Sequence, residues 1–105
     1  EYGLWIIEDA CHAPGGYFID STAKKQMCGN GTFADLAIFS FHPVKHIAAG
    51  EGGMITTNSK ALYEKLLLLR THGITKNPDL LEENHGGWYY EMQVLGYNYR
   101  LTDFQ

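Results

Sequence analysis

The sequence lacks the features that mark membrane, secreted and nucleic-acid-binding proteins. Its 105 residues include only two cysteines, Cys11 and Cys28, which give no basis for a disulfide scaffold. No apolar run approaches the roughly 20 residues that a helix needs to cross a bilayer, and no secretory signal opens the chain. Acidic residues outnumber basic ones by 12 to 8, which argues against a nucleic-acid partner. We therefore expect a cytoplasmic protein that binds neither membranes nor nucleic acids.

Two common catalytic patterns are also missing. The phosphate-loop pattern GxxxxGK[ST] is absent, so the sequence gives no support for nucleotide hydrolysis. The spacing of Cys11 and His12 relative to Cys28 matches no compact zinc module. In the pair His42 and His46, the proline that follows His42 disrupts the helical geometry that such a pair would need. A non-catalytic interaction or metal-binding module built on His and Cys stays open as an alternative of a different class.

What is present resembles an ordinary globular domain. Hydrophobic residues make up 45% and charged residues 19% of the chain, and its length allows one small domain with a modest core. The chain does not begin with Met, and an apolar run starts at Leu4. Near the other end, Thr102 and Gln105 have the spacing of a capping box, which announces a helix. We expect an internal segment of a longer protein.

Apolar runs predict the strands. Residues 4–8 and 36–41 are nearly continuous in apolar side chains, which is typical of strands buried on both faces. A third strand is predicted at 54–57 and a short one at 17–19, and Pro43 should end the second run. Together with a helix, these strands predict an α/β layered fold with a largely covered sheet.

The clearest helix is predicted over residues 60–72. Leu62, Leu66 and Leu69 recur at the spacing that places apolar side chains on one helix face. Gly73 fits the C′ position, where a left-handed backbone favours glycine. No sustained period follows between residues 74 and 96, and a loop of this length suggests a functional role.

Three polar residues stand at or just after predicted strand ends. Asp9 follows the first strand, and Ser40 and Lys45 lie at and after the end of the second. In open α/β sheets, ligands bind at the carboxyl ends of strands. Pyridoxal phosphate chemistry needs a lysine amine, a carboxylate beside the pyridine nitrogen, and donors for the phosphate, and these three residues match those needs in type. Taken singly, each has a simpler reading: a helix cap, an ordinary serine and a solvated cation.

Four stretches carry a family resemblance: "IIEDACHAPGG", "FADLAIFSFHPVKHIAAGEGGMITTN", "LRTHGI" and "LGYNYRLTDFQ". In this order and spacing they resemble the DegT/DnrJ/EryC1/StrS sugar aminotransferases, which are fold-type I enzymes dependent on pyridoxal 5′-phosphate. The resemblance implies a three-layer, mostly parallel sheet. It also implies that residues 1–105 form part of the large cofactor-binding domain, without its amino-terminal part and without the carboxyl-terminal small domain.

The resemblance assigns a role to five residues. Lys45 matches the lysine that bonds to the cofactor and shuttles the proton, and Asp9 matches the partner of the pyridine nitrogen. His12 matches a position near the phenolic oxygen of the cofactor, and we expect it on the same helical face as Asp9. Ser40 matches a phosphate ligand. Asn98 matches an asparagine that reaches the phosphate of the neighbouring subunit, so the resemblance implies an active homodimer.

The segment "EENHGGWYYE" resembles one branch of the family most. That branch transfers an amino group from L-glutamate to a UDP-linked 2-acetamido-2,6-dideoxy-4-hexulose on the way to pseudaminic acid. Trp88, Tyr89 and Tyr90 would then lie near the nucleotide sugar, unless they only anchor the loop. An enzyme of the same family for another 3- or 4-keto nucleotide sugar is the alternative. Because the parts that complete the family's site are not in this chain, we expect residues 1–105 alone to be inactive.

Overall fold

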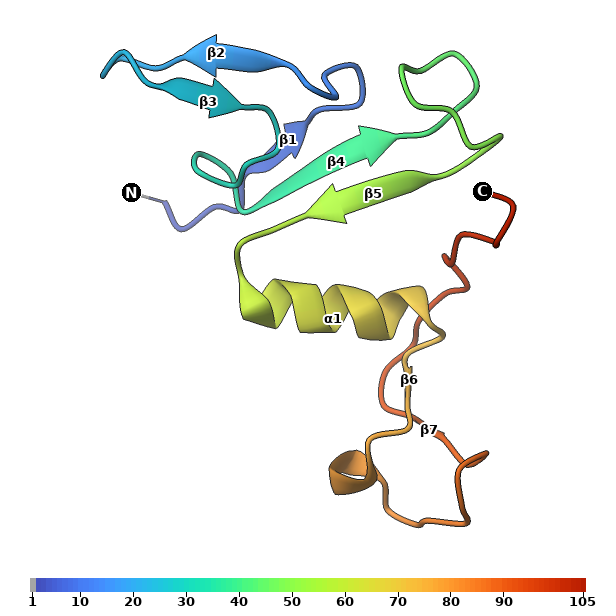
Figure 1. Ribbon diagram of the computed structural model, residues 1–105. Helices are drawn as coiled ribbons and strands as arrows, with labels where there is room; N and C mark the ends of the chain where they lie inside the picture. The colour runs from blue at the N-terminus through green and yellow to red at the C-terminus, as the bar shows by residue number, and fades with distance from the viewer. Residues whose placement is uncertain (1) are drawn as a thin grey trace. The chain divides into compact units, whose positions relative to one another are not determined.

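The computed structural model describes residues 2–105, which form two compact units (Figure 1). Residues 2–60 and 101–105 form the first, called the sheet unit below. Residues 61–100 form the second, called the helix unit. No helix among the described residues is long and apolar enough to cross a membrane.

A three-stranded sheet organises the sheet unit. Its strands are β1 (Ile7–Asp9), β4 (Leu36–Ser40) and β5 (Gly53–Thr56), with β4 between the other two (Figure 1). The pairing of β1 with β4 is parallel, and that of β4 with β5 is antiparallel. The strands predicted at 36–41 and 54–57 are therefore confirmed within about a residue, and β4 ends before Pro43 as expected.

The first strand differs from the prediction of a buried strand at 4–8. It begins only at Ile7, and the side chains of Leu4 and Trp5 are 78% and 70% exposed. Strand β4 starts at Leu36, and the chain before it is a loop, so Leu4 and Trp5 have no ladder partner. The apolar run is thus a correct sign of a strand, but nothing among the described residues covers its faces. The predicted burial is wrong for this part of the chain.

A hairpin joins β1 to β4. It consists of β2 (Tyr17–Ile19), which the sequence predicted, and β3 (Lys25–Met27), which it did not. The carboxylate of Asp20 holds the turn by accepting hydrogen bonds from the backbone N–H and hydroxyl of Thr22, at 2.8 and 2.7 Å, and from the side chain of Gln26 at 2.8 Å. These bonds, the one from the Thr22 hydroxyl first, hold the pKa of Asp20 far below its ordinary value.

Only two apolar side chains of the described residues are fully buried. Ala10 and Ala37 are each 1% exposed, and they lie just after β1 and within β4. The N–H of Ala10 continues the parallel ladder by donating to the Ile38 carbonyl at 2.9 Å. The small core therefore sits where β1 and β4 meet, immediately below the strand ends that carry Asp9 and Ser40.

Helix α1 (Lys60–Arg70) opens the helix unit and confirms the predicted helix. Leu62, Leu66 and Leu69 are half-buried, as the predicted apolar face requires. The helix ends two residues early. His72, rather than Gly73, occupies the C′ position with a φ of +57°, and the N–H of Gly73 donates to the Leu68 carbonyl at 2.9 Å. Histidine is one of the non-glycine residues found more often in this conformation.

The loop after α1 is closed by a short ladder. Strands β6 (Ile74–Thr75) and β7 (Glu91–Met92) pair antiparallel, and one turn of 3-10 helix, η1 (Pro78–Leu80), lies between them. The side chain of Asn77 caps η1 by accepting a hydrogen bond from the Asp79 N–H at 3.1 Å. The sequence predicted an irregular stretch over residues 74–96, and within it β6 and β7, which were not predicted, bring together the two ends of the loop 76–90.

Candidate active site

The carboxyl ends of β1 and β4 lie at the same edge of the sheet. Because the two strands are parallel and Asp9 is opposite Ile38, Asp9 and Ser40 both stand at this edge. Strand β5 runs the other way and begins there, with Gly53 opposite Ser40. The ladder alone therefore brings together two of the predicted site residues that are 31 positions apart in the chain.

A folded turn after β4 positions Lys45. The N–H of Lys45 donates to the His42 carbonyl at 2.9 Å, and the N–H of Val44 donates to Nδ1 of His42 at 3.3 Å. The N–H of His42 in turn donates to the hydroxyl oxygen of Ser40 at 3.3 Å. Pro43 suits this turn because its fixed φ matches the second position of a common β-turn. Lys45, which is half-buried, thus returns toward the sheet edge instead of extending into solvent.

The amine of Lys45 contacts His12. The distance between Nζ of Lys45 and Nε2 of His12 is 2.5 Å, although the two residues are 33 positions apart. His12 is not on a helix, contrary to the prediction of a helical turn after Asp9. The chain after β1 makes a tight turn in which the Ala13 N–H donates to the Ala10 carbonyl at 2.9 Å, and Pro14 and Gly15 follow. This turn, and not a helix face, places His12 near Asp9.

Asp9 carries a negative charge at neutral pH. Hydrogen bonds from the thiol and backbone N–H of Cys11 hold the pKa of the Asp9 carboxyl below its ordinary value, and the nearby side chains of His12 and Lys45 lower it further. The backbone bond, to Oδ1, measures 3.1 Å. The same contact with Asp9 raises the pKa of the Cys11 thiol. The carboxylate of Asp9 is therefore close enough to His12 and Lys45 to interact with both electrostatically.

Ser40 presents a hydroxyl at the same edge of the sheet. Its oxygen accepts one hydrogen bond from the backbone, and among residues 2–105 its hydrogen has no acceptor. Gly50 and Gly52, in the turn that leads into β5, have φ values of +79° and +150°. Glycine adopts such positive φ values without the steric penalty of a side chain, which allows the tight turn here. The edge of the sheet thus combines a carboxylate, an imidazole, a hydroxyl and a primary amine.

The other predicted site residues belong to the helix unit. The backbone of Asn98 bridges to Thr71, and its side chain is exposed. Tyr89 is half-buried and stacks edge-on against Trp88 and His85, whereas Trp88 and Tyr90 are exposed. The structure therefore brings Asp9, His12, Ser40 and Lys45 together in one unit, and places Asn98 and the three aromatic residues in the other.

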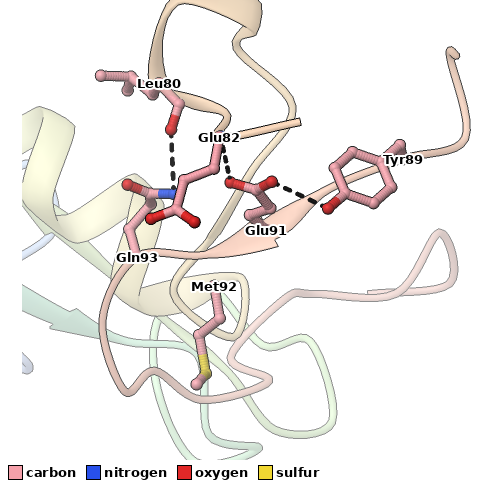
Figure 2. A pocket seen from close by; sticks show the side chains of 6 residues that line it. All are labelled: Leu80, Glu82, Tyr89, Glu91, Met92 and Gln93. Atoms are coloured by element: carbon pink, nitrogen blue, oxygen red, sulfur yellow. Dashed lines mark hydrogen bonds between the residues drawn. The ribbon is translucent and has the colours of Figure 1, made fainter. Parts of the chain in front are cut away.

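A pocket of about 520 Å³ lies in the helix unit (Figure 2). The carboxylate of Glu91 organises it, accepting hydrogen bonds from the N–H groups of Glu82 and Glu83, at 2.8 and 3.1 Å, and from the Tyr89 hydroxyl at 2.9 Å. The bond from Glu82 is the main reason that the pKa of Glu91 is lowered, and the bond to Glu91 raises the pKa of Tyr89. Since these internal bonds occupy the carboxylate, the pocket offers less reactive chemistry than the sheet edge.

Glu91 is the residue that sequence reasoning missed. Glu91 is the last residue of the segment "EENHGGWYYE", and no local pattern marks one glutamate among its neighbours as the acceptor for three donors. Its partners, Glu82 and Glu83, are themselves acidic, so charge patterning would have predicted repulsion. Only their backbone N–H groups make the contact, and these are invisible in a sequence.

No group of three or more His, Cys, Asp and Glu side chains that could hold a metal ion occurs within residues 2–105. Cys11 and Cys28 are both free thiols. Cys11 and His12, which were considered as ligands together with Cys28, are instead in contact with Asp9 and Lys45.

Comparisons with known proteins show the family to which the chain is similar. The model of the DegT/DnrJ/EryC1/StrS aminotransferase family matches residues 1–105. Over 103 residues, the chain is 45% identical to UDP-4-amino-4,6-dideoxy-N-acetyl-β-L-altrosamine transaminase from Campylobacter jejuni, covering 98% of this chain and 23% of that protein. The chain spans about a quarter of the length of the curated relatives that it matches.

Solved structures show the same similarity. PseC from Helicobacter pylori, an aminotransferase involved in pseudaminic acid biosynthesis, is 31% identical with a TM-score of 0.67, over 96% of this chain and 23% of that one. A Streptococcus pneumoniae protein assigned as a sugar aminotransferase, solved in a PLP form, is 27% identical with a TM-score of 0.67, over 95% of this chain and 23% of that one. Both are similar to this chain across nearly its whole length.

Proposed function

Because this chain belongs to the DegT/DnrJ/EryC1/StrS aminotransferase family, we propose that it carries part of the active site of a sugar aminotransferase dependent on pyridoxal 5′-phosphate. The observation that supports this most strongly is the meeting of Asp9, His12, Ser40 and Lys45 at one edge of the sheet. Residues 1–105 would be part of the large, cofactor-binding domain of an α/β fold, working in the cytoplasm.

The residues at this edge fit the cofactor. Asp9 is ionised at neutral pH and suits a protonated pyridine nitrogen, and the unused hydroxyl hydrogen of Ser40 suits a phosphate oxygen. His12 lies beside both Asp9 and Lys45, at a position suited to the phenolic oxygen. When bound, pyridoxal phosphate supplies a carbonyl carbon for an amine and a ring that accepts electrons.

The remaining roles would fall to the protein's own groups. The turn from His42 to Lys45 places the amine beside His12 and within electrostatic reach of Asp9. Asp9 would hold the ring nitrogen in its charged form, and Ser40 would bind the phosphate. The amine of Lys45 would then be the base that moves the proton required for transamination.

For the substrate, we propose a UDP-linked 2-acetamido-2,6-dideoxy-4-hexulose, with L-glutamate as the amino donor. The similarity to the Campylobacter jejuni transaminase and to PseC supports this choice, as does the loop "EENHGGWYYE". Trp88, Tyr89 and Tyr90 would lie near the sugar nucleotide. We further propose a homodimer in which Asn98 reaches the cofactor of the neighbouring subunit. A different 3- or 4-keto nucleotide sugar is the alternative substrate.

The test starts from the full protein, incubated with pyridoxal phosphate and reduced with borohydride. We expect a yellow protein and, after reduction, a cofactor adduct on Lys45 by peptide mass spectrometry. Turnover with L-glutamate and a panel of 3- and 4-keto nucleotide sugars then identifies the substrate. Absence of an adduct, with stoichiometric zinc bound instead, would contradict the proposal and favour a metal-binding module. Residues 1–105 alone should give no turnover, and substantial activity would overturn that part.

A further inference from the structure

The contact between Lys45 and His12 restricts the chemical state of the histidine. The distance between Nζ of Lys45 and Nε2 of His12 is 2.5 Å. A lysine ammonium has three hydrogen-bond donors and no acceptor, and an imidazole nitrogen can accept only when it carries no hydrogen. With the lysine as an ammonium, this contact therefore requires a neutral His12 whose one ring hydrogen is on Nδ1.

The same contact cannot persist when His12 takes up a proton. Both ring nitrogens would then be donors, facing an ammonium group that also only donates, and two positive charges would meet at hydrogen-bond distance. The titratable groups that act on the pair from neighbouring segments are Asp9, at the end of β1, and Cys11, in the turn that follows. Asp9 is a carboxylate and attracts both cations, but it does not remove the clash between the two donors.

We infer that neutral His12 is the positioning residue for the amine of Lys45, holding Nζ at the Asp9 side of the sheet edge whenever the amine is not bonded to a ligand. The inference rests on the proposed function only in taking this amine as the reacting group. Two loops contribute to it: the turn after β1 supplies the acceptor, and the turn after β4 supplies the amine. A lysine has four rotatable side-chain bonds, and this hydrogen bond selects the conformation in which the amine faces the site.

The geometry gives His12 a role beyond contact with a cofactor. Its Nε2 touches the nitrogen that the proposed function takes as the reacting group. An amide at this position can also accept a hydrogen bond and would preserve part of the orientation, whereas an apolar side chain would lose it.

The first experiment needs no catalysis. Nitrogen chemical shifts of the imidazole rings, recorded by NMR on the full protein without cofactor, report which ring nitrogen carries the hydrogen. We expect neutral His12 to carry it on Nδ1, and we expect Lys45→Met to abolish that preference. Lys65→Met, which removes an exposed lysine on α1, is the matched control and should leave His12 unchanged. A hydrogen on Nε2 in the unmodified protein, or no response to Lys45→Met, would overturn the inference.

The second experiment measures how fast Lys45 captures pyridoxal phosphate, trapped with borohydride and quantified by mass. His12→Leu, which removes the partner of the amine, should capture at least about tenfold more slowly than the unmodified protein. His12→Gln offers an amide oxygen that can also accept, so its rate should lie between those of the unmodified protein and His12→Leu.

These outcomes separate the inference from the proposed function. If the ring hydrogen responds to Lys45→Met but Lys45 captures no cofactor, the contact is real and the proposed function fails. If Lys45 captures pyridoxal phosphate normally but the hydrogen position on the His12 ring does not change in Lys45→Met, the proposed function stands and the inference fails. Capture by His12→Leu at the rate of the unmodified protein would also overturn the inference, as would capture by His12→Gln that is as slow as by His12→Leu.

Discussion

The sheet unit and the helix unit position their polar side chains by different means. At the sheet edge, the parallel ladder places Asp9 and Ser40, and backbone hydrogen bonds place Lys45. In the helix unit, one carboxylate, that of Glu91, holds three donors of the loop that contains Tyr89. The first arrangement leaves its side chains available for chemistry. The second uses its charged side chain for structure.

This difference has consequences for substitution. When the backbone places a side chain, replacing that side chain removes its chemistry and leaves the frame in place. When a titratable side chain holds the backbone, the local fold depends on pH, and replacing that side chain changes the local fold. Four substitutions test the comparison, and they are ordered here by the size of the expected effect.

Lys45→Ala in the sheet unit should lower turnover by about 10³-fold or more, because no other group can supply the reacting amine. The fold should not change, since the contact that holds the turn comes from the backbone N–H of residue 45. Steady-state kinetics and circular dichroism measure the two effects. Lys65→Ala on α1 is the control and should retain full activity. Normal turnover by the Lys45→Ala protein would show that the sheet edge is not the active site.

Asp9→Asn should lower turnover by about 100-fold, through loss of a charge rather than loss of shape. Asparagine keeps the oxygen that accepts from the Cys11 N–H, so the turn after β1 should persist. Because the pKa of Asp9 lies below its ordinary value of 3.8, the unmodified enzyme should lose no activity through this group until the pH falls below that value. Asp79→Asn, in the loop of the helix unit, is the matched control. Steady-state kinetics from pH 4 to 8 measure the effect. Equal turnover by Asp9→Asn and Asp79→Asn would contradict the role of Asp9.

Gly73→Ala should destabilise the helix unit by about 2 kcal/mol. The residue is buried with a φ of +68°, and an added Cβ would overlap the carbonyl of Val94. Gly87→Ala is the control, because a Cβ there meets nothing within 4 Å. Urea unfolding of the two variants gives the difference. Equal stabilities would show that this close approach of two backbones is not needed.

Glu91→Gln should have the smallest effect, a several-fold increase in hydrogen exchange at the N–H groups of Glu82 and Glu83. The pKa of Glu91 is lowered in the folded protein, so its contacts are complete above its ordinary value of 4.5 and are lost as the pH falls through the lower, folded value. The Tyr89 hydroxyl should ionise at lower pH in the variant, because the bond to Glu91 raises its pKa. Unchanged exchange and unchanged tyrosine absorbance would show that the ladder of β6 and β7 holds the loop without this carboxylate.

Much of the fold followed from local sequence patterns. Strands β2, β4 and β5 and helix α1 lie where apolar runs and periodicity predicted them. At the other end of the sheet unit, Gln105 accepts a hydrogen bond from the Thr102 N–H at 2.9 Å, one of the two bonds of the predicted capping box. These features depend on residues close in sequence, which is why a single sequence predicts them.

The errors have a common physical origin. Burial of residues 4–8 depends on what covers the sheet. After Asp9 the sequence predicted a turn of helix, but the chain instead forms a tight turn, which Pro14 and Gly15 favour. Strand β3 has few apolar residues and forms because β2 and the Asp20 turn provide a partner. Each depends on an interaction that reaches beyond a local window.

The sequence by itself determined which chemical groups this protein has, in which order, and that an amine and a hydroxyl follow the same strand, because these facts depend on composition and local periodicity. Only the tertiary structure decided that Asp9 and Ser40 share an edge and that the imidazole of His12 meets the amine of Lys45. The reason is that strand pairing and turn geometry join residues more than thirty positions apart, and no spacing along the chain records which distant segments will pair.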